Sequence, residues 1–453
     1  MTSTNGQGPA QPGSRIPFRE ALRVWIKVAL LSFGGPAGQI AVMHRLLVEE
    51  KGWIDERRFL HALNYTMVLP GPEAQQLATY LGWLLHGTRG GLVAGALFVL
   101  PGFLSILVLS ILYAFYQELA PVQALFYGLK PAVMAVVAAA VVRIGEKALR
   151  NGILMFLAAT AFVSIFFLEV PFPLIIIGAA FTGWLGGRLR PEVFLPPESS
   201  GNEPEAVRGG APSPSWGRAL RLCLIWIPLW FAPLALLALY FGAEHLFVTQ
   251  GIFFSKMAVI TFGGAYAVLA YVAQRAVEDY GWLAPGEMLD GLGMAETTPG
   301  PLIQVVQFVA FMGAFRFHGE LSPLASALIA SVLATWVTFV PCFLWIFLGA
   351  PYIEKLQHNR SLNAALTAVT AAVVGVILNL AVWFSLNTLF GRLTEIHTYG
   401  LRLLVPAWAT LDLPALVIAA AAFLALFRYR TGLIPTLAGS AAAGLLYRLL
   451  LHP

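Results

Sequence analysis

Four short motifs of glycine and proline interrupt long apolar stretches of this sequence. They are Phe33-Gly34-Gly35-Pro36, Pro70-Gly71-Pro72, Phe262-Gly263-Gly264 and Pro299-Gly300-Pro301. Proline removes a backbone donor and glycine allows non-helical dihedral angles, so we expect a helix to break at each motif. A helix that restarts after such a break presents free N–H groups and the positive end of its dipole, which together bind anions. The alternative is that the motifs are only packing kinks.

Polar side chains accompany these motifs. Lys27 and Lys256 each lie six residues before the phenylalanine of a Phe-Gly-Gly motif. A cation in such apolar surroundings is costly unless it is paired, reaches the membrane interface or binds an anion. Gln75 and Gln304 follow the Pro-Gly-Pro motifs and carry amide groups that can donate to an oxyanion. We therefore predict an oxyanion site formed by Lys27, Phe33, Gly34, Gly35, Pro70, Gly71, Pro72, Gln75, Lys256, Phe262, Gly263, Gly264, Pro299, Gly300, Pro301 and Gln304, with Gln39, Gln76 and Gln307 as secondary candidates.

Three carboxylates lie in or next to the interrupted segments. Glu73, Asp290 and Glu296 are candidates for a relay of protons or other ions, and the alternative is that they stabilise helix N-termini. The sequence contains no nucleophile–base constellation, no nucleotide-binding loop and no cluster of metal ligands. Cys223 and Cys342 both lie in apolar runs and are expected to be packing residues. We therefore predict a protein that is not an enzyme and holds no cofactor or metal.

The composition determines the class of protein that carries these motifs. The chain has 453 residues, of which 58% are hydrophobic and 11% charged, whereas soluble domains have about 45–50% apolar and about 25% charged residues. Too few charges remain to cover a soluble body, and intrinsic disorder, collagen and disulfide scaffolds are also excluded. With about 20 residues per span, the length predicts an all-α polytopic membrane protein of about 13 transmembrane helices. The net charge of +5 is expected from the excess of Lys and Arg in cytoplasmic loops, so no nucleic-acid partner is predicted.

The two halves of the chain are copies of one domain. Residues 27–75 align without a gap to residues 256–304, and 16 of these 49 positions are identical. We predict a cytoplasmic tail at 1–21, a first repeat at 22–188, a cytoplasmic linker rich in Pro, Gly and Ser at 189–217, an extra helix at 218–242 and a second repeat at 250–453. One extra helix between two copies inverts the second copy in the membrane, provided that no re-entrant segment lacks a counterpart in the other half. The breaks are expected near the membrane midplane.

The distribution of Lys and Arg favours a cytoplasmic N-terminus, with one exception. The loop between His44 and His61 carries Arg45, Lys51, Arg57 and Arg58, yet a count of straight spans places this loop outside. Either the acids of the loop dilute its charge, or the segment at about 22–44 does not cross as one straight helix. Whether the segments at 62–84 and 290–314 span fully or are re-entrant is also left open.

The motifs resemble those of the chromate ion transporter family, in its long form with two homologous halves. The resemblance rests on Phe33-Gly34-Gly35-Pro36, Trp53, Pro70-Gly71-Pro72 with Gln75, Phe262-Gly263-Gly264, Trp282 and the run from Ala295 to Pro301. It implies a multi-pass transporter of the inner membrane that exports chromate, a sulfate-like tetrahedral dianion, using the chemiosmotic gradient. One departure is Ala265, which stands where the first repeat has Pro36.

We therefore expect a secondary transporter that works by alternating access around a central oxyanion site. A transporter for sulfate, molybdate or another anion, running outward or inward, is the first alternative, and an anion channel is the second. The expected partners are the oxyanion and the lipid bilayer, and a homodimer is a further expectation.

Overall fold

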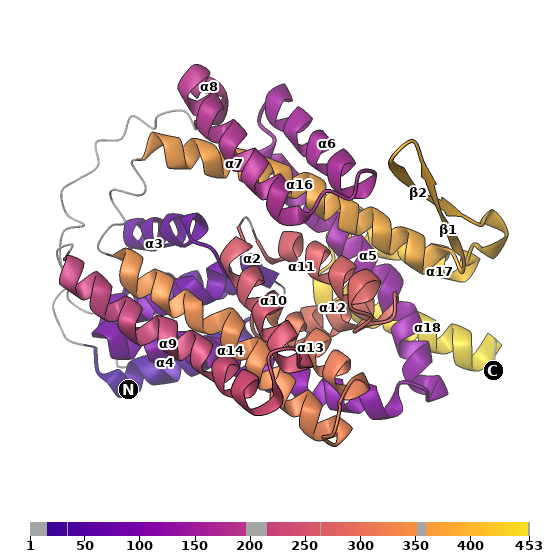
Figure 1. The fold of residues 1–453 in the computed structure, drawn as a ribbon, viewed down its shortest axis with the longest axis horizontal. Helices are drawn as coiled ribbons and strands as arrows, with labels where there is room; N and C mark the ends of the chain where they lie inside the picture. Colours follow the sequence, from indigo (N-terminus) through magenta and orange to yellow (C-terminus); the bar gives the residue numbers. More distant parts are fainter. Residues whose placement is uncertain (1–15, 34, 196–214, 263, 351–358, 452–453) are drawn as a thin grey trace, which may run out of the picture.

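The computed structural model describes residues 16–33, 35–195, 215–262, 264–350 and 359–451, which are almost entirely helical (Figure 1). The elements are α1 (Phe18–Leu31), α2 (Gly35–His44), η1 (Arg45–Glu50), α3 (Glu56–Val68), α4 (Glu73–Tyr116), α5 (Ala120–Ala148), α6 (Gly152–Phe166), α7 (Phe172–Leu189), α8 (Pro191–Phe194), α9 (Trp216–Phe241), α10 (Leu246–Ile260), α11 (Ala265–Gln274), η3 (Arg275–Asp279), α12 (Glu287–Thr297), η4 (Leu302–Gln304), α13 (Val305–Arg316), α14 (Pro323–Gly349), α16 (Arg360–Leu389), β1 (Leu393–Thr398), β2 (Leu401–Pro406), η6 (Trp408–Thr410), α17 (Leu413–Phe423), η7 (Leu424–Arg428), α18 (Leu433–Leu446) and η8 (Tyr447–Leu451).

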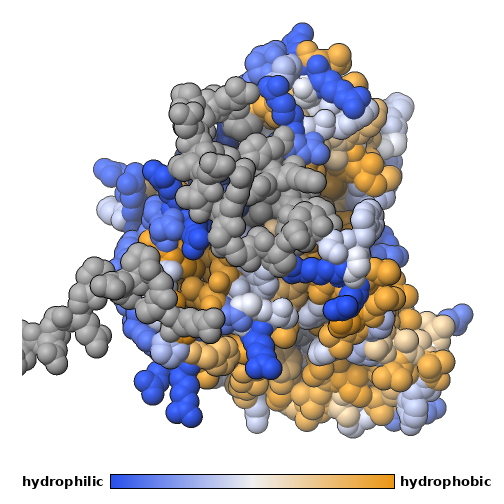
Figure 2. Space-filling view, turned by 90° about the vertical axis from the view of Figure 1, so that its left-hand side faces the viewer, coloured by the Kyte–Doolittle hydropathy of each residue, from blue (hydrophilic) through white to orange (hydrophobic). Residues whose placement is uncertain are grey.

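Long apolar helices identify a multi-pass membrane protein. Within the described residues, six helices are long and apolar enough to cross a membrane, namely α4, α5, α7, α9, α14 and α16. Their outer faces expose large apolar side chains such as Leu239, Leu224 and Phe181, and Figure 2 shows apolar side chains over much of the surface seen from one end of the molecule. A soluble monomer rarely exposes so much apolar surface. The expected all-α polytopic membrane protein is thus confirmed.

The first apolar segment folds back on itself. α1 ends at Leu31 and α2 begins at Gly35. The Nζ atom of Lys27 lies 3.1 Å from a carboxylate oxygen of Glu50, and that of Lys51 lies 2.8 Å from one of Glu20. The chain has therefore returned, by residue 51, to the end of the molecule where α1 begins. The charged stretch from residue 44 to residue 61 lies at this end as well, which removes its conflict with the charge count.

The second apolar segment also forms a re-entrant hairpin. α3 and the start of α4 run antiparallel, with the rings of Tyr65 and Tyr80 5.1 Å apart. The chain reverses again inside α4, where His86 and Gly87 have non-helical dihedral angles and Gly87 has φ +63°. Nε2 of His86 donates to the carbonyl oxygen of Ile16 at 2.8 Å, so this reversal lies beside the start of α1. Only the part of α4 after Gly87 runs through to the opposite end.

The second repeat contains the same two hairpins, formed by α10 with α11 and by α12 with α13, and they enter from the opposite end of the molecule. The rings of Phe253 in α10 and Tyr280 after η3 are 5.5 Å apart. Glu287 at the start of α12 forms an ion pair with Arg316 at the end of α13. The open end of this second hairpin lies near Tyr113, in the last turn of α4. The hairpins of the two repeats therefore enter from opposite ends of the molecule.

The inversion of the second repeat follows from the number of crossings before it. Four crossings in the first repeat bring the chain back to the end where it started, and α9 then carries it to the opposite end. α6 starts beside α8, since Nδ2 of Asn151 donates to the carbonyl oxygen of Val193 at 3.0 Å. It ends at the other side, where the carbonyl oxygen of Phe167 accepts from the backbone N–H of Arg402 at 2.8 Å. The second part of α4, together with α5, α6 and α7, thus runs from end to end, and α9 adds a fifth crossing. The prediction of about 13 spans is not established, because four predicted apolar segments fold back.

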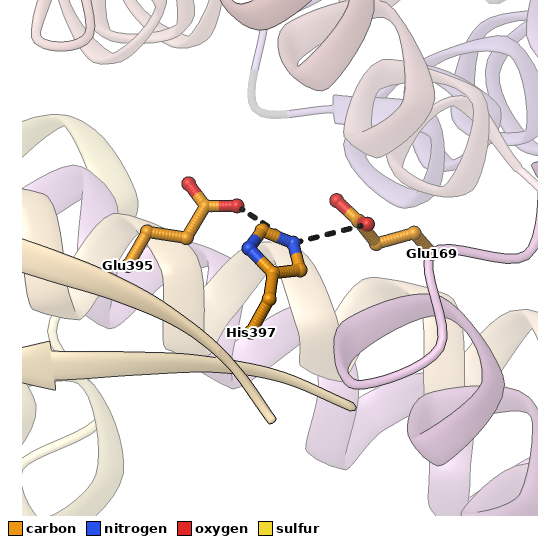
Figure 3. A group of neighbouring side chains, drawn as sticks. All are labelled: Glu169, Glu395 and His397. Atoms are coloured by element: carbon orange, nitrogen blue, oxygen red, sulfur yellow. Dashed lines mark ion pairs between the residues drawn. The ribbon is translucent and has the colours of Figure 1, made fainter. Parts of the chain in front are cut away.

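A two-stranded hairpin that the sequence did not predict closes the end opposite to the N-terminus. β1 and β2 pair antiparallel, and Arg402 of β2 is buried among three glutamates, with Glu278 at 2.8 Å and Glu395 at 2.9 Å. Burial works to lower the pKa of Arg402, but its contacts with these glutamates outweigh burial and raise that pKa. His397 lies between Glu169 and Glu395 (Figure 3). Because the guanidinium already balances these carboxylates, we assign the cluster a structural role that ties the hairpin to the loops of both repeats.

The re-entrant arrangement makes a labelling prediction. In a background with Cys223→Ala and Cys342→Ala, we expect Arg57→Cys and Glu320→Cys to react with an impermeant maleimide from opposite sides of the membrane, because the hairpins of the two repeats open at opposite ends. The measurement is labelling of intact spheroplasts against inside-out vesicles.

Trp216→Cys, at the start of α9, is the control and should react from the same side as Arg57→Cys. Labelling of Arg57→Cys and Glu320→Cys from one side would contradict the inverted arrangement.

Candidate functional site

The four breaks meet in pairs across the two repeats. The backbone N–H of Gly71 donates to the carbonyl oxygen of Thr261 at 2.8 Å, and that of Gly300 donates to the carbonyl oxygen of Ser32 at 2.9 Å. Gly71 and Gly300 are equivalent positions in the repeats, and so are Ser32 and Thr261. Each Pro-Gly-Pro break is thus bonded to the end of the helix before the other repeat's Phe-Gly-Gly motif, with approximate two-fold symmetry.

Close packing explains why glycine is needed at these points. Gly71 has φ +121° and Gly300 has φ +102°, conformations that residues with a Cβ atom rarely adopt. A Cβ atom on Gly300 would lie 2.9 Å from the Cα atom of Gly102, and one on Gly71 would lie 3.0 Å from Sγ of Cys342. Gly102 and Cys342 are again equivalent, because Pro101-Gly102-Phe103-Leu104 in α4 matches Pro341-Cys342-Phe343-Leu344 in α14. Each break therefore rests directly on a long helix of the other repeat.

The half-helices that restart at the breaks have uncapped N-termini. In the described part of the chain, no side chain accepts a hydrogen bond from the first turn of α4, α11 or η4, which begin after Pro72, Gly264 and Pro301. Their first N–H groups therefore remain available to an anion. Phe33 and Phe262 are half-buried beside these ends. Gly34 and Gly263 lie outside the described residues.

The glutamines of the predicted site are buried close to the breaks. Nε2 of Gln75 donates to Oγ1 of Thr79 at 3.1 Å, and Nε2 of Gln304 donates to Oε1 of Gln307 at 2.6 Å. An amide has two N–H donors. Both donors of Gln304 are engaged, since its Nε2 also donates to Oγ1 of Thr335 at 2.9 Å, whereas Gln75 uses one of its donors in the contact with Thr79. Gln39 holds a break directly, since its Nε2 donates to the carbonyl oxygen of Gly300 at 2.6 Å.

The two lysines of the predicted site lie away from the breaks. The side chain of Lys27 is 53% exposed and is paired with Glu50 inside the first hairpin. Lys256 is exposed on α10. The charge of Lys27 is therefore balanced by its own hairpin, and the cations that face the carboxylates near the breaks come from another helix.

α5 supplies these cations near the carboxylates of both Pro-Gly-Pro segments. Glu296, at the end of α12, is buried and accepts a hydrogen bond from the hydroxyl of Tyr266 in the first turn of α11. Arg143 is exposed on α5 and acts electrostatically on both of these groups from a longer distance, without an ion pair to either among the described residues. Glu73, the first residue of α4, is acted on by Lys147. Arg143 and Lys147 are four residues apart and so lie on one face of α5.

Asp290 lies apart from the other two carboxylates. It is six residues before Glu296 on α12, which is about 9 Å along the helix. Its Oδ2 atom accepts from the hydroxyl of Tyr113 at 2.8 Å and lies 3.4 Å from Nζ of Lys130. The structure therefore brings Glu73 and Glu296 to the breaks and places Asp290 nearer the end that carries the β-hairpin.

Several site residues were missed by reasoning from the sequence. Lys130 lies inside an apolar segment, where an ionisable residue is itself a signal of function. Glu146 lies one turn after Arg143 on the same helix, so the sequence favours a pair between these two residues instead. No sequence signal identified Tyr266, because its role depends on the meeting of α11 with α12.

Comparison with known proteins agrees with this geometry. The family model of the chromate transporter matches residues 19–184 and 248–445, one match in each repeat. The chain belongs to the chromate transporter family. It is 29% identical over 397 residues to the probable chromate transport protein of Synechococcus elongatus, covering 86% of this chain and 90% of that one. It is 27% identical to the chromate transport protein of Cupriavidus metallidurans, covering 83% and 84% of the two chains, and 32% identical to that of Pseudomonas aeruginosa, covering 78% and 77%.

No solved structure gives a significant match to this chain. Both family matches contain the pair of re-entrant hairpins described above, and both leave out α9. Each match of the family model thus covers one repeat, and α9 lies between the two matches.

The packing of the breaks makes a prediction for Gly102→Ala. The new methyl group would lie 2.9 Å from the carbonyl oxygen of Pro299, so we expect a loss of about 1–3 kcal/mol in stability from overpacking and a loss of transport as the hydrogen bond from Gly300 to Ser32 is strained. Thermal unfolding in detergent and uptake into proteoliposomes measure the two effects.

Gly178→Ala is the matched control, because a Cβ atom there has no neighbour within 4 Å. Equal effects of the two substitutions would show that the contact between α4 and the break is unimportant.

Proposed function

We propose that this protein is a secondary transporter that exports chromate across the inner membrane, driven by the chemiosmotic gradient. The observation that carries the proposal is the symmetric pairing of the four breaks, at Ser32 with Gly300 and at Thr261 with Gly71. Broken helices with free N–H groups, held between inverted repeats, are the usual architecture of an ion-binding site in secondary transporters. The names of three relatives support chromate as the anion.

We place the oxyanion between the four breaks. The first N–H groups of α4, α11 and η4 point their positive dipole ends into this region, and Arg143 and Lys147 add two cations from α5. Together they match the two negative charges and the acceptor oxygens of a tetrahedral dianion. Phe33, Phe262, Gln75 and the other predicted site residues at the breaks are proposed to shape and close this site.

Glu73 and Glu296 are the proposed coupling groups. Lys147 acts electrostatically on Glu73 and Arg143 on Glu296, so we propose that each carboxylate competes with the oxyanion for a positive partner. Neutralising a carboxylate by a proton releases its cation to the anion, and loss of that proton reverses the exchange. The proton and the oxyanion then bind together and move in the same direction. With one proton per dianion, the transported complex keeps a net negative charge, and the inside-negative membrane potential drives its exit.

Alternating access follows from the inversion of the repeats. One pair of hairpins opens toward the N-terminal end and the other toward the end with the β-hairpin, and the two backbone hydrogen bonds at the breaks join them at the centre. If the two repeats exchange conformations, the central site becomes open to the opposite side. The re-entrant hairpins gather Arg45, Lys51 and Arg57 at the N-terminal end, which supports a cytoplasmic N-terminus.

The same chemistry would accept sulfate or molybdate. N–H groups and cations recognise the shape and charge of a tetrahedral dianion rather than its central atom. Transport of another oxyanion is therefore the second candidate function, and an anion channel is a third, which requires flux without coupling to a gradient.

The test is transport by the purified full-length protein in proteoliposomes. We expect saturable movement of chromate that responds to an imposed proton gradient and membrane potential. Saturable sulfate movement with no chromate movement would assign the second function, and non-saturating flux that ignores the proton gradient would assign the channel.

Removing the cation that faces Glu296 tests the site. We expect Arg143→Gln to lower the apparent affinity for chromate by about tenfold or more, since a hydrogen bond to a charged group contributes about 1.5–3 kcal/mol. Arg188→Gln is the control, because Arg188 stacks on Trp184 in the last turn of α7, away from the breaks. Equal affinities of the two variants would exclude Arg143 from the site.

A further inference from the structure

A large cavity opens at the end of the molecule that carries the β-hairpin. Its volume is about 740 Å³, and it is lined by the end of α4, the start of α5, one residue of α12 and the C-terminal turn η8. One water needs only about 10–15 Å³ of such space, so the cavity holds many waters and admits a hydrated anion. We call it the vestibule.

The vestibule has one ion pair in its wall. Asp290 is buried with 3% of its side chain exposed, whereas 31% of the Lys130 side chain is exposed. Nζ of Lys130 lies 3.4 Å from Oδ2 of Asp290, and the hydroxyl of Tyr113 donates to the same oxygen at 2.8 Å. Charge-assisted N–H···O bonds are usually about 2.7–2.9 Å long. The lysine is therefore loosely held by its carboxylate and remains accessible from the vestibule.

Neither member of this pair is fully satisfied. Oδ1 of Asp290 is buried and has no hydrogen-bond partner among the described residues. An ammonium group has three donors, and Asp290 is the one ion-pair partner of Lys130 in the part of the chain that the structure describes. Lys130 can thus bind an incoming group without breaking a tight contact.

A second cation lies on the same wall. The guanidinium of Arg448, in η8, stacks on the ring of Tyr127 at 4.4 Å, and both residues line the vestibule with Lys130. The hydroxyl of Tyr127 donates to Asp412 at 2.6 Å, which holds the ring in place. The wall therefore presents two cations, Lys130 and Arg448, and two carboxylates, Asp290 and Glu118. Of the two carboxylates, Asp290 is the one within ion-pair distance of Lys130 among the described residues.

We propose that the vestibule is a second oxyanion site, in which Lys130 binds the departing anion and Asp290 competes with the anion for Lys130. The proposal rests on the proposed function, because it concerns the exit of the same oxyanion. The anion pairs with Lys130 and Arg448 as it leaves the breaks. Asp290 is fixed close to Lys130, so its carboxylate can form the ion pair again and displace the anion. This competition lowers the affinity of the vestibule for the anion. Asp290 is a positioning residue that acts through Lys130 and keeps binding of the anion weak enough for its release.

The competition predicts opposite effects for neighbouring substitutions. Asp290→Asn removes the competitor, so we expect sulfate and chromate to bind about tenfold more tightly, as for the gain of one charge-assisted hydrogen bond, while the rate of transport falls. Lys130→Gln should weaken binding. Tyr113→Phe leaves Asp290 with Lys130 as its remaining partner, so we expect this variant to bind the anion more weakly than the wild type.

The experiment is equilibrium binding of radiolabelled sulfate and of chromate to the full-length protein in nanodiscs, with transport measured in parallel. Glu320→Gln, between α13 and α14 at the same end, removes the same charge outside the vestibule and should bind like the wild type. Weaker binding by Asp290→Asn, or tighter binding by Glu320→Gln to the same extent as Asp290→Asn, would overturn the proposal. If Asp290→Asn does not fold, tighter binding by Tyr113→Phe overturns it.

The wild-type protein separates this proposal from the proposed function. A wild type that moves no oxyanion at all refutes the proposed function and, with it, the exit site. A wild type that transports normally, with Asp290→Asn unchanged in affinity, refutes the exit site alone.

Discussion

The structure depends on two backbone hydrogen bonds at its centre, from Gly71 to Thr261 and from Gly300 to Ser32. Within the hydrocarbon of a membrane, every backbone polar group needs a partner, and a broken helix leaves several without one. Here each repeat supplies one such partner to the break of the other, while the first N–H groups of the restarting helices stay available to an anion. The breaks can exist only because both repeats are present and inverted, so the fold and the proposed anion site have the same physical origin. The positive φ angles of Gly71 and Gly300, and the absence of a side chain at Gly102, allow the close approach that these bonds require.

Three cations along the proposed anion pathway lie on one helix, α5. α5 crosses the molecule beside α12 and carries Lys130 toward one end and Arg143 and Lys147 toward the other. Lys130 pairs with Asp290, and Arg143 and Lys147 act at longer range on Glu296 and Glu73. Because charges inside a membrane are costly when unpaired, this pairing keeps the pathway stable while it is empty. It also makes each pair a place where an oxyanion can exchange with a fixed carboxylate.

Much of the fold was predictable from the sequence, and the site only in part. The breaks at both Pro-Gly-Pro motifs were predicted, because proline and glycine act on the local backbone. Lys27 was predicted to meet the anion but is paired with Glu50, a contact that exists only because α1 and α2 fold back. Gln75 lies close to a break as expected, yet its amide donates to Thr79. The two-stranded hairpin was not predicted, since β1 and β2 are short and lie between long apolar segments.

The sequence by itself determined the membrane class, the duplication and the position of each break. These properties follow from composition and from residues next to one another in the chain. The tertiary structure decided which segments cross and which return, which break bonds to which, and that Tyr266 meets Glu296. Those outcomes depend on contacts between groups that are often more than a hundred residues apart. Local backbone preferences cannot specify such contacts, because packing between whole helices selects them.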